Sequence, residues 1–418
     1  MNRTTELKIV IAGGGIAGLA AALAFRKAGH AVIVVERTAS LATVGAGILI
    51  QANGLLVLDT LGLGAAVRAA GVQRPAFDLR NRQGRVLLRT DFDPVLPATL
   101  YPVSIHRAEL HRILWEGCAS AGVSLHLGHK VKGVEASALH AALICETATG
   151  EKRIDGDLVI GADGVKSVVR DAGGFIAHLE PVIEGSVQGV CPFPVAERFH
   201  GEYFGGGEAC GMLPIGGAHT FWFWGGSGKT VAKLENISFL AWKTRVANSF
   251  PAMQQVLAHQ SQWSGLVRRL HRSIRCETWS RNNVVLIGDA AHAMSPNLGQ
   301  GANCALVDAL ALVCHVAALP RTAAIGDALA QFERERRPLV EAMQRRGTQE
   351  GIVGTQDWPG AELLFKLLLR LARLASSARR RAEIRMISGL GRDGFDLAAA
   401  GILPRVPWQA PIRLESGV

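Results

Sequence analysis

Glycine and acidic residues near the N-terminus have the types and spacing needed to bind a phosphate-containing cofactor. Gly13, Gly15 and Gly18 form a G-x-G-x-x-G pattern, and Glu36 follows it. The first glycine permits a sharp turn, the second lets the backbone approach a diphosphate, and the third lets a helix pack closely on a strand. Amide groups at the helix N-terminus would hold the diphosphate, and a carboxylate at Glu36 would accept hydrogen bonds from ribose hydroxyls. The set predicts a dinucleotide site.

Two further segments carry an acidic residue at the end of a predicted strand. The first, residues 161–170, contains Asp163, Gly164, Ser167 and Arg170. The second, residues 283–312, has a strand that ends at Gly288-Asp289, then a loop rich in Gly and Pro, then a helix that we expect to begin near Leu298. Asp-Gly is also a common turn pair, so a turn at Asp163 is the alternative to a functional role.

Hydrophobic periodicity predicts the elements that position these residues. A β-branched run, an alanine-rich helix and a second strand form a βαβ unit over residues 7–36. Short runs broken by Gly and Pro suggest an antiparallel sheet later in the chain. We predict an α/β fold in which a Rossmann-type cofactor-binding domain carries an inserted, mainly antiparallel β-sheet domain and C-terminal helices. The expected ranges are 1–75, 100–175 and 276–350 for the cofactor domain, 76–99 and 176–275 for the substrate-binding sheet, and 351–418 for the C-terminal helices.

Composition excludes several classes of protein. Of 418 residues, 49% are hydrophobic and 19% charged, which is typical of a globular protein. The seven cysteines are scattered without ligand spacing, so we expect neither a disulfide framework nor a metal site. The net charge is +10, but aromatic residues are only 6% and no nucleic-acid motif is present, so we expect no nucleic-acid partner. The N-terminal residues lack the pattern of a signal peptide, and we expect a cytoplasmic protein.

The three motifs together resemble those of the single-component FAD-dependent aromatic hydroxylases, the group A flavoprotein monooxygenases that include salicylate, 3-hydroxybenzoate and 6-hydroxynicotinate monooxygenases. The resemblance covers roughly residues 7–345 in content, order and spacing. It implies that the chain binds FAD and uses NADH or NADPH as a transient cosubstrate. It also implies that reduced flavin adds dioxygen at C4a and that the hydroperoxide hydroxylates an aromatic or heteroaromatic substrate.

The resemblance implies roles for individual residues. Around the adenosine and the diphosphate these are Gly13, Gly15, Gly18, Glu36, Arg37, Arg107 and Val131. Around the ribityl chain and the isoalloxazine ring they are Gly47, Asp289, Pro296, Gly299, Gln300 and Gly301. The Asp-Gly motif with Asp163 is associated in that family with both FAD and the nicotinamide cofactor. The helix N-terminus behind this loop would stabilise negative charge on reduced flavin by roughly 0.3–2 kcal/mol. For His292 we favour a structural, hydrogen-bonded role beside the cofactor over a catalytic one.

The inserted sheet supplies candidates for the substrate pocket. In residues 221–224, Phe221 and Phe223 share one face of a strand, and Trp222 and Trp224 share the other. One face should cover a flat apolar ligand and the other could be core, and the sequence does not choose between them. The remaining candidates are His200, Tyr203 and Met212. His200 or Tyr203 could act as the base that generates a phenolate, and Pro296 completes the candidate catalytic set. The basic chain would suit an anionic aromatic substrate.

Residues 361–390 have leucines at helical spacing, with seven basic and two acidic residues. One interpretation is a helix packed on the body of a monomer or at a homodimer contact. The other is a basic amphipathic helix that lies on a membrane surface. Two alternatives for the function also stay open. The same fold could carry out epoxidation, N-oxidation or Baeyer–Villiger insertion, or the chain could be a non-catalytic flavin-binding or membrane-peripheral protein that responds to redox state.

Overall fold

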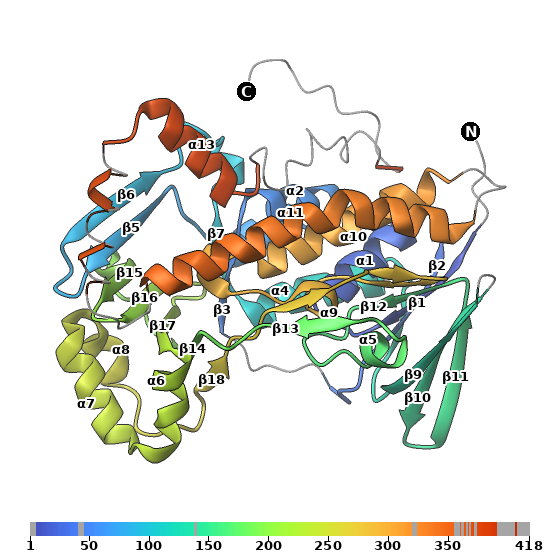
Figure 1. Ribbon diagram of the computed structural model, residues 1–418, viewed down its shortest axis with the longest axis horizontal. Coiled ribbons are helices and arrows are strands. Elements are labelled where there is room, and N and C mark those ends of the chain that lie inside the picture. Colours follow the sequence, from blue (N-terminus) through green and yellow to red (C-terminus); the bar gives the residue numbers. More distant parts are fainter. Residues whose placement is uncertain are drawn as a thin grey trace.

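A six-stranded sheet forms the centre of one of the two parts of the molecule (Figure 1). The computed structural model describes residues 6–40, 46–137, 140–319, 324–354, 360, 363–364, 367, 369–371, 374–390 and 406–407. The strands run in the order β20 (Ser280–Arg281), β21 (Val284–Leu286), β12 (Leu158–Gly161), β1 (Lys8–Ala12), β2 (Ala31–Val35) and β8 (Ser124–His126). All neighbours pair in parallel except β20 with β21. Because both faces of such a sheet are covered, its strands are continuous β-branched runs.

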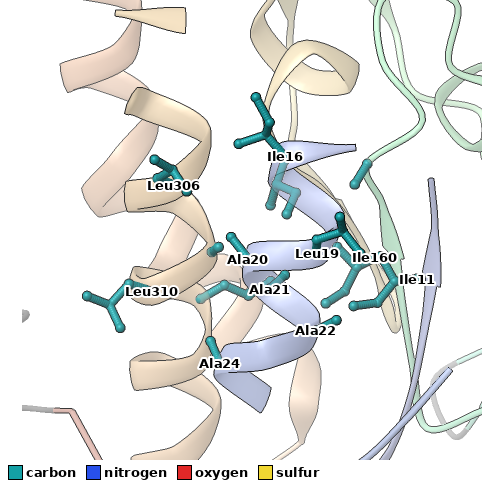
Figure 2. Packing of buried hydrophobic residues seen from close by; sticks show 14 of the residues in the cluster. Ile11, Ile16, Leu19, Ala20, Ala21, Ala22, Ala24, Ile160, Leu306 and Leu310 are labelled. Carbon is teal, nitrogen blue, oxygen red and sulfur yellow. The ribbon is translucent and has the colours of Figure 1, made fainter. Parts of the chain in front are cut away.

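Small side chains bring two helices together on this sheet. Helix α1 (Ile16–Lys27) follows β1, and its alanines at positions 20–22 and 24 are fully buried. Figure 2 shows these alanines between Ile11 and Ile160 of the sheet and Leu306 and Leu310 of α10 (Gly301–Ala317). Alanine occupies little volume, so α10 lies close to α1. Nearly every side chain of α10 is buried, which explains why the helix is apolar all round.

Further helices and small sheets surround this centre. The helices are α2 (Ala52–Thr60), α3 (Gly64–Ala70), α4 (Arg107–Ser120), α5 (Val168–Ala172), α9 (Asp289–His292) and α11 (Ile325–Gly354). One small sheet contains β3 (Gly47–Ile50), β7 (Val103–His106) and β4 (Val72–Gln73). The second contains β11 (Gly150–Gly156), β10 (Ala141–Thr147) and β9 (Lys130–Ala136), and the third β13 (Ala177–Leu179) and β19 (Ile274–Cys276).

A seven-stranded sheet forms the centre of the other part of the molecule. Its order is β18 (Val267–Leu270), β14 (Glu184–Cys191), β17 (Thr220–Ser227), β16 (Glu208–Pro214), β15 (Gly201–Gly205), β5 (Ala76–Asn81) and β6 (Val86–Asp91). All neighbours are antiparallel except β15 with β5. The helices α6 (Gly228–Ala232), α7 (Phe239–Ser249) and α8 (Gln254–Leu257) cover one face. Short 3-10 turns lie at Ala98–Leu100, Glu197–Phe199, Lys233–Asn236 and Pro251–Met253.

The predicted fold class is confirmed, since a parallel Rossmann-like sheet is joined to a mainly antiparallel sheet. Helix α13 (Ser377–Ile387) packs Ile384 against Phe92 and Leu96. The helix expected near Leu298 begins later, at Gly301, because a 3-10 turn (Pro296–Leu298) precedes it and Gly299 takes a left-handed conformation with φ 61°. Among the described residues, no helix has both the length and the apolar character needed to cross a membrane.

Candidate active site

The glycine motif forms the turn between β1 and α1. Gly13 has φ +104°, and a Cβ atom there would lie 2.5 Å from the carbonyl oxygen of Ala162. A Cβ atom on Gly18 would overlap the carbonyl oxygen of Gly13. Gly15 differs, because nothing lies within 4 Å of the position its Cβ atom would take. Gly13 and Gly18 therefore fit the chain to itself, whereas Gly15 borders open space at the N-terminus of α1.

The carboxylate of Glu36 holds this turn to the end of β2. Its Oε2 accepts a hydrogen bond from the amide of Gly14 at 2.9 Å, and its Oε1 accepts one from the amide of Thr38 at 3.0 Å. The amide of His129 donates to the carbonyl oxygen of Glu36, which brings the start of β9 and Val131 to this corner. Glu36 is only partly buried, so its carboxylate has further acceptor positions for a ribose hydroxyl. Arg37 is exposed beside it.

Two arginines and one aspartate from different elements lie close enough to interact electrostatically. Arg107 begins α4, and its amide donates to the carbonyl oxygen of Ala46 at 3.0 Å. Burial lowers the pKa of the Arg107 guanidinium, Asp289 opposes this effect, and Arg269 of β18 adds to it. No described residue accepts a hydrogen bond from either guanidinium. Two like charges so placed favour an anion such as a diphosphate. No pattern in the sequence pointed to Arg269, because the sheet that carries it is inserted between distant segments.

A buried ionic cluster fixes the backbone next to Asp289. Asp308 of α10 accepts hydrogen bonds from the Gly288 amide at 3.2 Å, from His292 Nε2 at 2.5 Å and from Arg336 Nη2 at 3.0 Å. Asp308, His292 and Arg336 are each at most 2% exposed. Burial alone would raise the pKa of Asp308, but His292 and Arg336 lower it overall. The structural role expected for His292 is confirmed, and Asp289 is left exposed at the start of α9.

The Asp-Gly motif supports the same corner from a second side. Asp163 accepts hydrogen bonds from Ser167 Oγ at 2.5 Å and from the amides of Val168 and Val169, so it caps α5. Burial raises the pKa of Asp163, and these hydrogen bonds oppose the rise. Arg170 of α5 is buried and donates to the carbonyl oxygen of Ala290 at 3.1 Å. In this structure the motif therefore acts through the fold, by fastening α9.

The loop that carries Pro296 is tied to the seven-stranded sheet. Glu184 of β14 accepts hydrogen bonds from Ser295 Oγ at 2.5 Å and from Asn297 Nδ2 at 3.0 Å. Burial raises the pKa of Glu184, and the two hydrogen bonds oppose the rise. Asn297 also donates to the carbonyl oxygen of Gly347 in α11. Pro296 itself is exposed between these anchors. The sheet and α11 together therefore hold the loop in place.

The second half of the loop is fixed by buried amide side chains. Gln300 is fully buried, accepts a hydrogen bond from Asn53 Nδ2 at 3.0 Å and donates to the carbonyl oxygen of Ile387. Gly299 and Gly301 are partly exposed, and they have no side chain that would cover the surface of the loop. Gln51 lies next to Gly299, and its buried Oε1 has no hydrogen-bond partner among the described residues. A buried oxygen of this kind can accept a hydrogen bond from a ligand or from an ordered water. Sequence reasoning missed Gln51, because an isolated glutamine belongs to no motif.

The register of the seven-stranded sheet decides which aromatic face meets this loop. Phe221 and Phe223 point toward β3, their rings are 6.1 Å apart, and a Cβ atom on Gly47 would overlap Phe221. The opposite face packs under α7 and α8, and it carries Tyr203, Met212, Trp222 and Trp224, all fully buried. Of the two faces that the sequence left open, the face of Trp222 and Trp224 is therefore core, and the pocket candidates Tyr203 and Met212 lie on that same core side.

The two candidate bases are both engaged by the protein. Tyr203 donates its hydroxyl hydrogen bond to the carbonyl oxygen of Phe199 at 2.8 Å. His200 Nε2 lies 2.8 Å from the carbonyl oxygen of Val195, and its Nδ1 lies 3.2 Å from Arg74 Nη1. Burial and then the charge of Arg74 lower the pKa of His200. Neither side chain reaches the loop around Pro296, so neither position supports the role of a base.

Comparison with known proteins identifies similar chains along nearly the whole length. A family model described as an FAD binding domain matches residues 6–347. An aurachin C monooxygenase/isomerase of Stigmatella aurantiaca is 31% identical over 394 residues, which cover 91% of this chain and 97% of that protein. A 2-heptyl-3-hydroxy-4(1H)-quinolone synthase of Mycobacteroides abscessus is 31% identical over 353 residues, covering 82% and 90%. The crystal structure of Klebsiella pneumoniae HpxO complexed with FAD and uric acid superposes with a TM-score of 0.79 at 20% identity and covers 94% of this chain and 100% of HpxO.

Proposed function

Because the chain belongs to the FAD binding domain family and is an FAD-dependent NAD(P)H monooxygenase, we propose that it hydroxylates a neutral aromatic or heteroaromatic ring held against Phe221 and Phe223. When bound, FAD takes a hydride from NAD(P)H and activates dioxygen, so that one oxygen atom is transferred to the substrate. The observation that carries the proposal is the aromatic face of β17, where Phe221 and Phe223 lie side by side and Phe221 adjoins Gly47.

The residues present fit FAD. The open space at Gly15, at the N-terminus of α1, accommodates a diphosphate, and Arg107 and Arg269 supply positive charge that no described carboxylate pairs with directly. Gln51 Oε1 lacks a donor at the loop where an isoalloxazine N–H would supply one. We propose that the adenosine end lies at Glu36 and Val131 and that the ring lies between the Pro296–Gly301 loop and the seven-stranded sheet. Asp163 would act indirectly, through α5.

Residues of this chain would position the reactants in two ways. The first turn of α10 precedes the first intrahelical hydrogen bond, from the Cys304 amide to the Gln300 carbonyl oxygen at 2.7 Å, so its amides point out of the helix. Such amides stabilise negative charge on a reduced ring. Phe221 and Phe223 would exclude water from the opposite side. We further propose that residues 1–75, 100–175 and 276–350 form the cofactor unit and residues 76–99 and 176–275 the substrate unit.

The proposed function is tested by following NADH and NADPH oxidation by the purified holoenzyme with a panel of quinolones, phenols and anilines. A substrate should accelerate oxidation, and mass spectrometry should find one atom from labelled dioxygen on the ring of the product. A product that carries the labelled oxygen elsewhere in the molecule would show that the enzyme catalyses another monooxygenation instead of ring hydroxylation. If no aromatic compound accelerates NAD(P)H oxidation, the proposal is wrong.

Replacing Asp289 with alanine is expected to weaken FAD binding by roughly 10- to 100-fold, since a buried hydroxyl that loses its acceptor costs about 1–3 kcal/mol. Asp289 is suited to this contact because it is exposed while its neighbours Gly288 and Ala290 are buried. The dissociation constant is measured by titrating apoprotein with FAD. Asp289→Asn keeps one acceptor and should lose less. Equal affinity in the alanine variant and the wild type would contradict a contact between Asp289 and FAD.

We also propose that a row of exposed leucines contacts an anionic lipid surface. Leu363, Leu367, Leu371 and Leu374 are 50–81% exposed, and Arg370 lies among them. Apolar side chains at helical spacing with arginines between them are typical of helices that lie at a bilayer surface. The result expected is co-sedimentation with vesicles that contain phosphatidylglycerol, reduced several-fold by Leu367→Glu.

The matched control is Leu240→Glu, because Leu240 is 69% exposed on α7, away from this row. Light scattering of the wild type distinguishes a lipid contact from a homodimer contact. If the wild type binds no vesicles and forms a dimer that Leu367→Glu dissociates, the row of leucines is a homodimer contact and the lipid proposal is wrong.

A further inference from the structure

Two carboxylates lie on the aromatic face of the seven-stranded sheet. Glu184 of β14 is hydrogen-bonded to Ser295 and Asn297 of the loop that carries Pro296, and the other carboxylate is Glu202. Glu202 of β15 pairs with Gly211 of β16, and Gly211 pairs in turn with Phe223 of β17. Residues directly opposite each other in neighbouring strands point to the same side of a sheet. Glu202 therefore shares its face with Phe223 and Phe221 and points away from α7 and α8. On its other side, β5 places Leu79 next to it.

The missing side chain at Gly211 brings Phe223 and Glu202 into one surface. A Cβ atom on Gly211 would overlap Cε1 of Phe223 and would lie 2.9 Å from its Cζ. The ring of Phe223 thus leans across Gly211 toward β15. The result is a row of two neighbouring aromatic rings, Phe221 and Phe223, that continues across the strands to Glu202.

Among the described residues, no group neutralises Glu202. No described residue donates a hydrogen bond to its carboxylate or forms an ion pair with it, although the side chain is half-buried. Burial raises the pKa of Glu202 to about 7, and the like charge of Glu350 on α11 adds to the rise. Glu350 itself accepts a hydrogen bond from Arg346 at 3.3 Å, and Arg346 also pairs with Glu383 of α13. A half-buried acceptor without a donor costs free energy that a ligand can recover.

Resting on the proposed function, we propose that Glu202 is the specificity-determining residue that accepts a hydrogen bond from an N–H or O–H group on the aromatic ring of the substrate. A ring that lies on Phe223 would direct such a group to the carboxylate. The hydrogen bond draws the proton away from the ring, which increases the electron density of the ring that is to be hydroxylated. The same carboxylate repels an anionic ring, so the net charge of +10 does not predict the charge of the substrate.

The test compares parent and methylated probes with the FAD-loaded wild type, Glu202→Ala and Glu202→Gln. The N–H pair is 2-heptyl-4(1H)-quinolone and its N-methyl derivative, and the O–H pair is 1-naphthol and 1-methoxynaphthalene. Dissociation constants come from the change in flavin absorbance, which needs no turnover. The matched control is Glu197→Gln, an exposed glutamate on the turn before β15.

Methylation is expected to weaken binding to the wild type and to the Glu197 control by roughly 10- to 100-fold for at least one pair, because a hydrogen bond to a charged acceptor is lost. In Glu202→Ala the parent and methylated probes should bind alike. Binding of the parent probe to the wild type should tighten as the pH rises through about 7, because the ionised carboxylate is the better acceptor. Glu350 is the titratable group that faces Glu202 from α11, and Glu202→Gln should remove this pH dependence.

Two results would overturn the proposal. The first is a methylation penalty of the same size in the wild type and in Glu202→Ala, which would mean that the methyl group is excluded by shape. The second is equal binding of parent and methylated probes to the wild type, while hydroxylation continues. In both cases the proposed function stands. Binding of none of the four probes to the wild type, together with no aromatic that accelerates NAD(P)H oxidation, would overturn both.

Discussion

A variant with leucine in place of Gly15 is expected to fold normally and to retain no FAD. Gly15 caps α1 with φ −79° and ψ −175°, a conformation that any residue adopts without strain. Nothing lies within 4 Å of the position of its Cβ atom, so the protein itself has room for a side chain. In the holoenzyme we expect the diphosphate to occupy this space, because it can approach the backbone closely only at a residue without a side chain. The measurement is the ratio of flavin to protein absorbance after purification, together with the melting temperature of the apoprotein.

The matched control for this variant is Gly326→Leu. Gly326 lies in the first turn of α11, where a Cβ atom would make only an ordinary contact of 3.7 Å with the carbonyl oxygen of Asn282. That protein should purify yellow, with a full complement of FAD. Gly18 would be a poor choice, because a side chain there overlaps Gly13 and disturbs the fold as well as the site. A Gly15→Leu protein that keeps its FAD would show that the diphosphate lies elsewhere.

The sequence predicted those parts of the site that are formed by residues close to one another along the chain. The turn at Gly13 and Gly15 and the carboxylate of Glu36 belong to one βαβ unit, so their spacing predicts their geometry. Asp289 could be predicted for a similar reason, since a strand, a turn and a helix follow one another around it. Even here the start of α10 was misplaced by three residues, because a proline begins a 3-10 turn as readily as an α-helix.

The residues that could not be predicted depend on pairing between distant strands. Alternation showed that Phe221 and Trp222 point to opposite faces, but only the position of α7 shows which face is core. Glu202 and Arg269, which we propose for the site, lie on β15 and β18 of one sheet, and neither residue stands in a motif. His200 and Tyr203 suggested chemistry by residue type alone, yet their hydrogen bonds are used within the protein.

A second large effect, on the free energy of unfolding, is expected at the buried ionic cluster of Asp308, His292 and Arg336. Asp308→Asn is expected to lower the free energy of unfolding by about 3–5 kcal/mol, because the buried Arg336 would lose the carboxylate that accepts its hydrogen bonds. The Gly288 amide would also lose a charged acceptor, so the backbone next to Asp289 should loosen and FAD binding should weaken with it. Urea unfolding of the apoprotein measures the first effect without any contribution from the cofactor, and FAD titration measures the second.

The comparison that isolates burial is an exposed pair of the same two residue types. Asp155 and Arg153 lie 2.8 Å apart on β11, and both are more than 40% exposed, so Asp155→Asn should cost less than about 1 kcal/mol. Replacing both partners, as Asp308→Leu with Arg336→Met, removes both charges of the pair and should cost less than the sum of the single changes. If the losses at Asp308 and Asp155 were equal, or the double variant were fully additive, Asp308 and Arg336 would not be coupled. The cluster would then contribute only packing, and the position of Asp289 would have to be set by α5 and Arg170 alone.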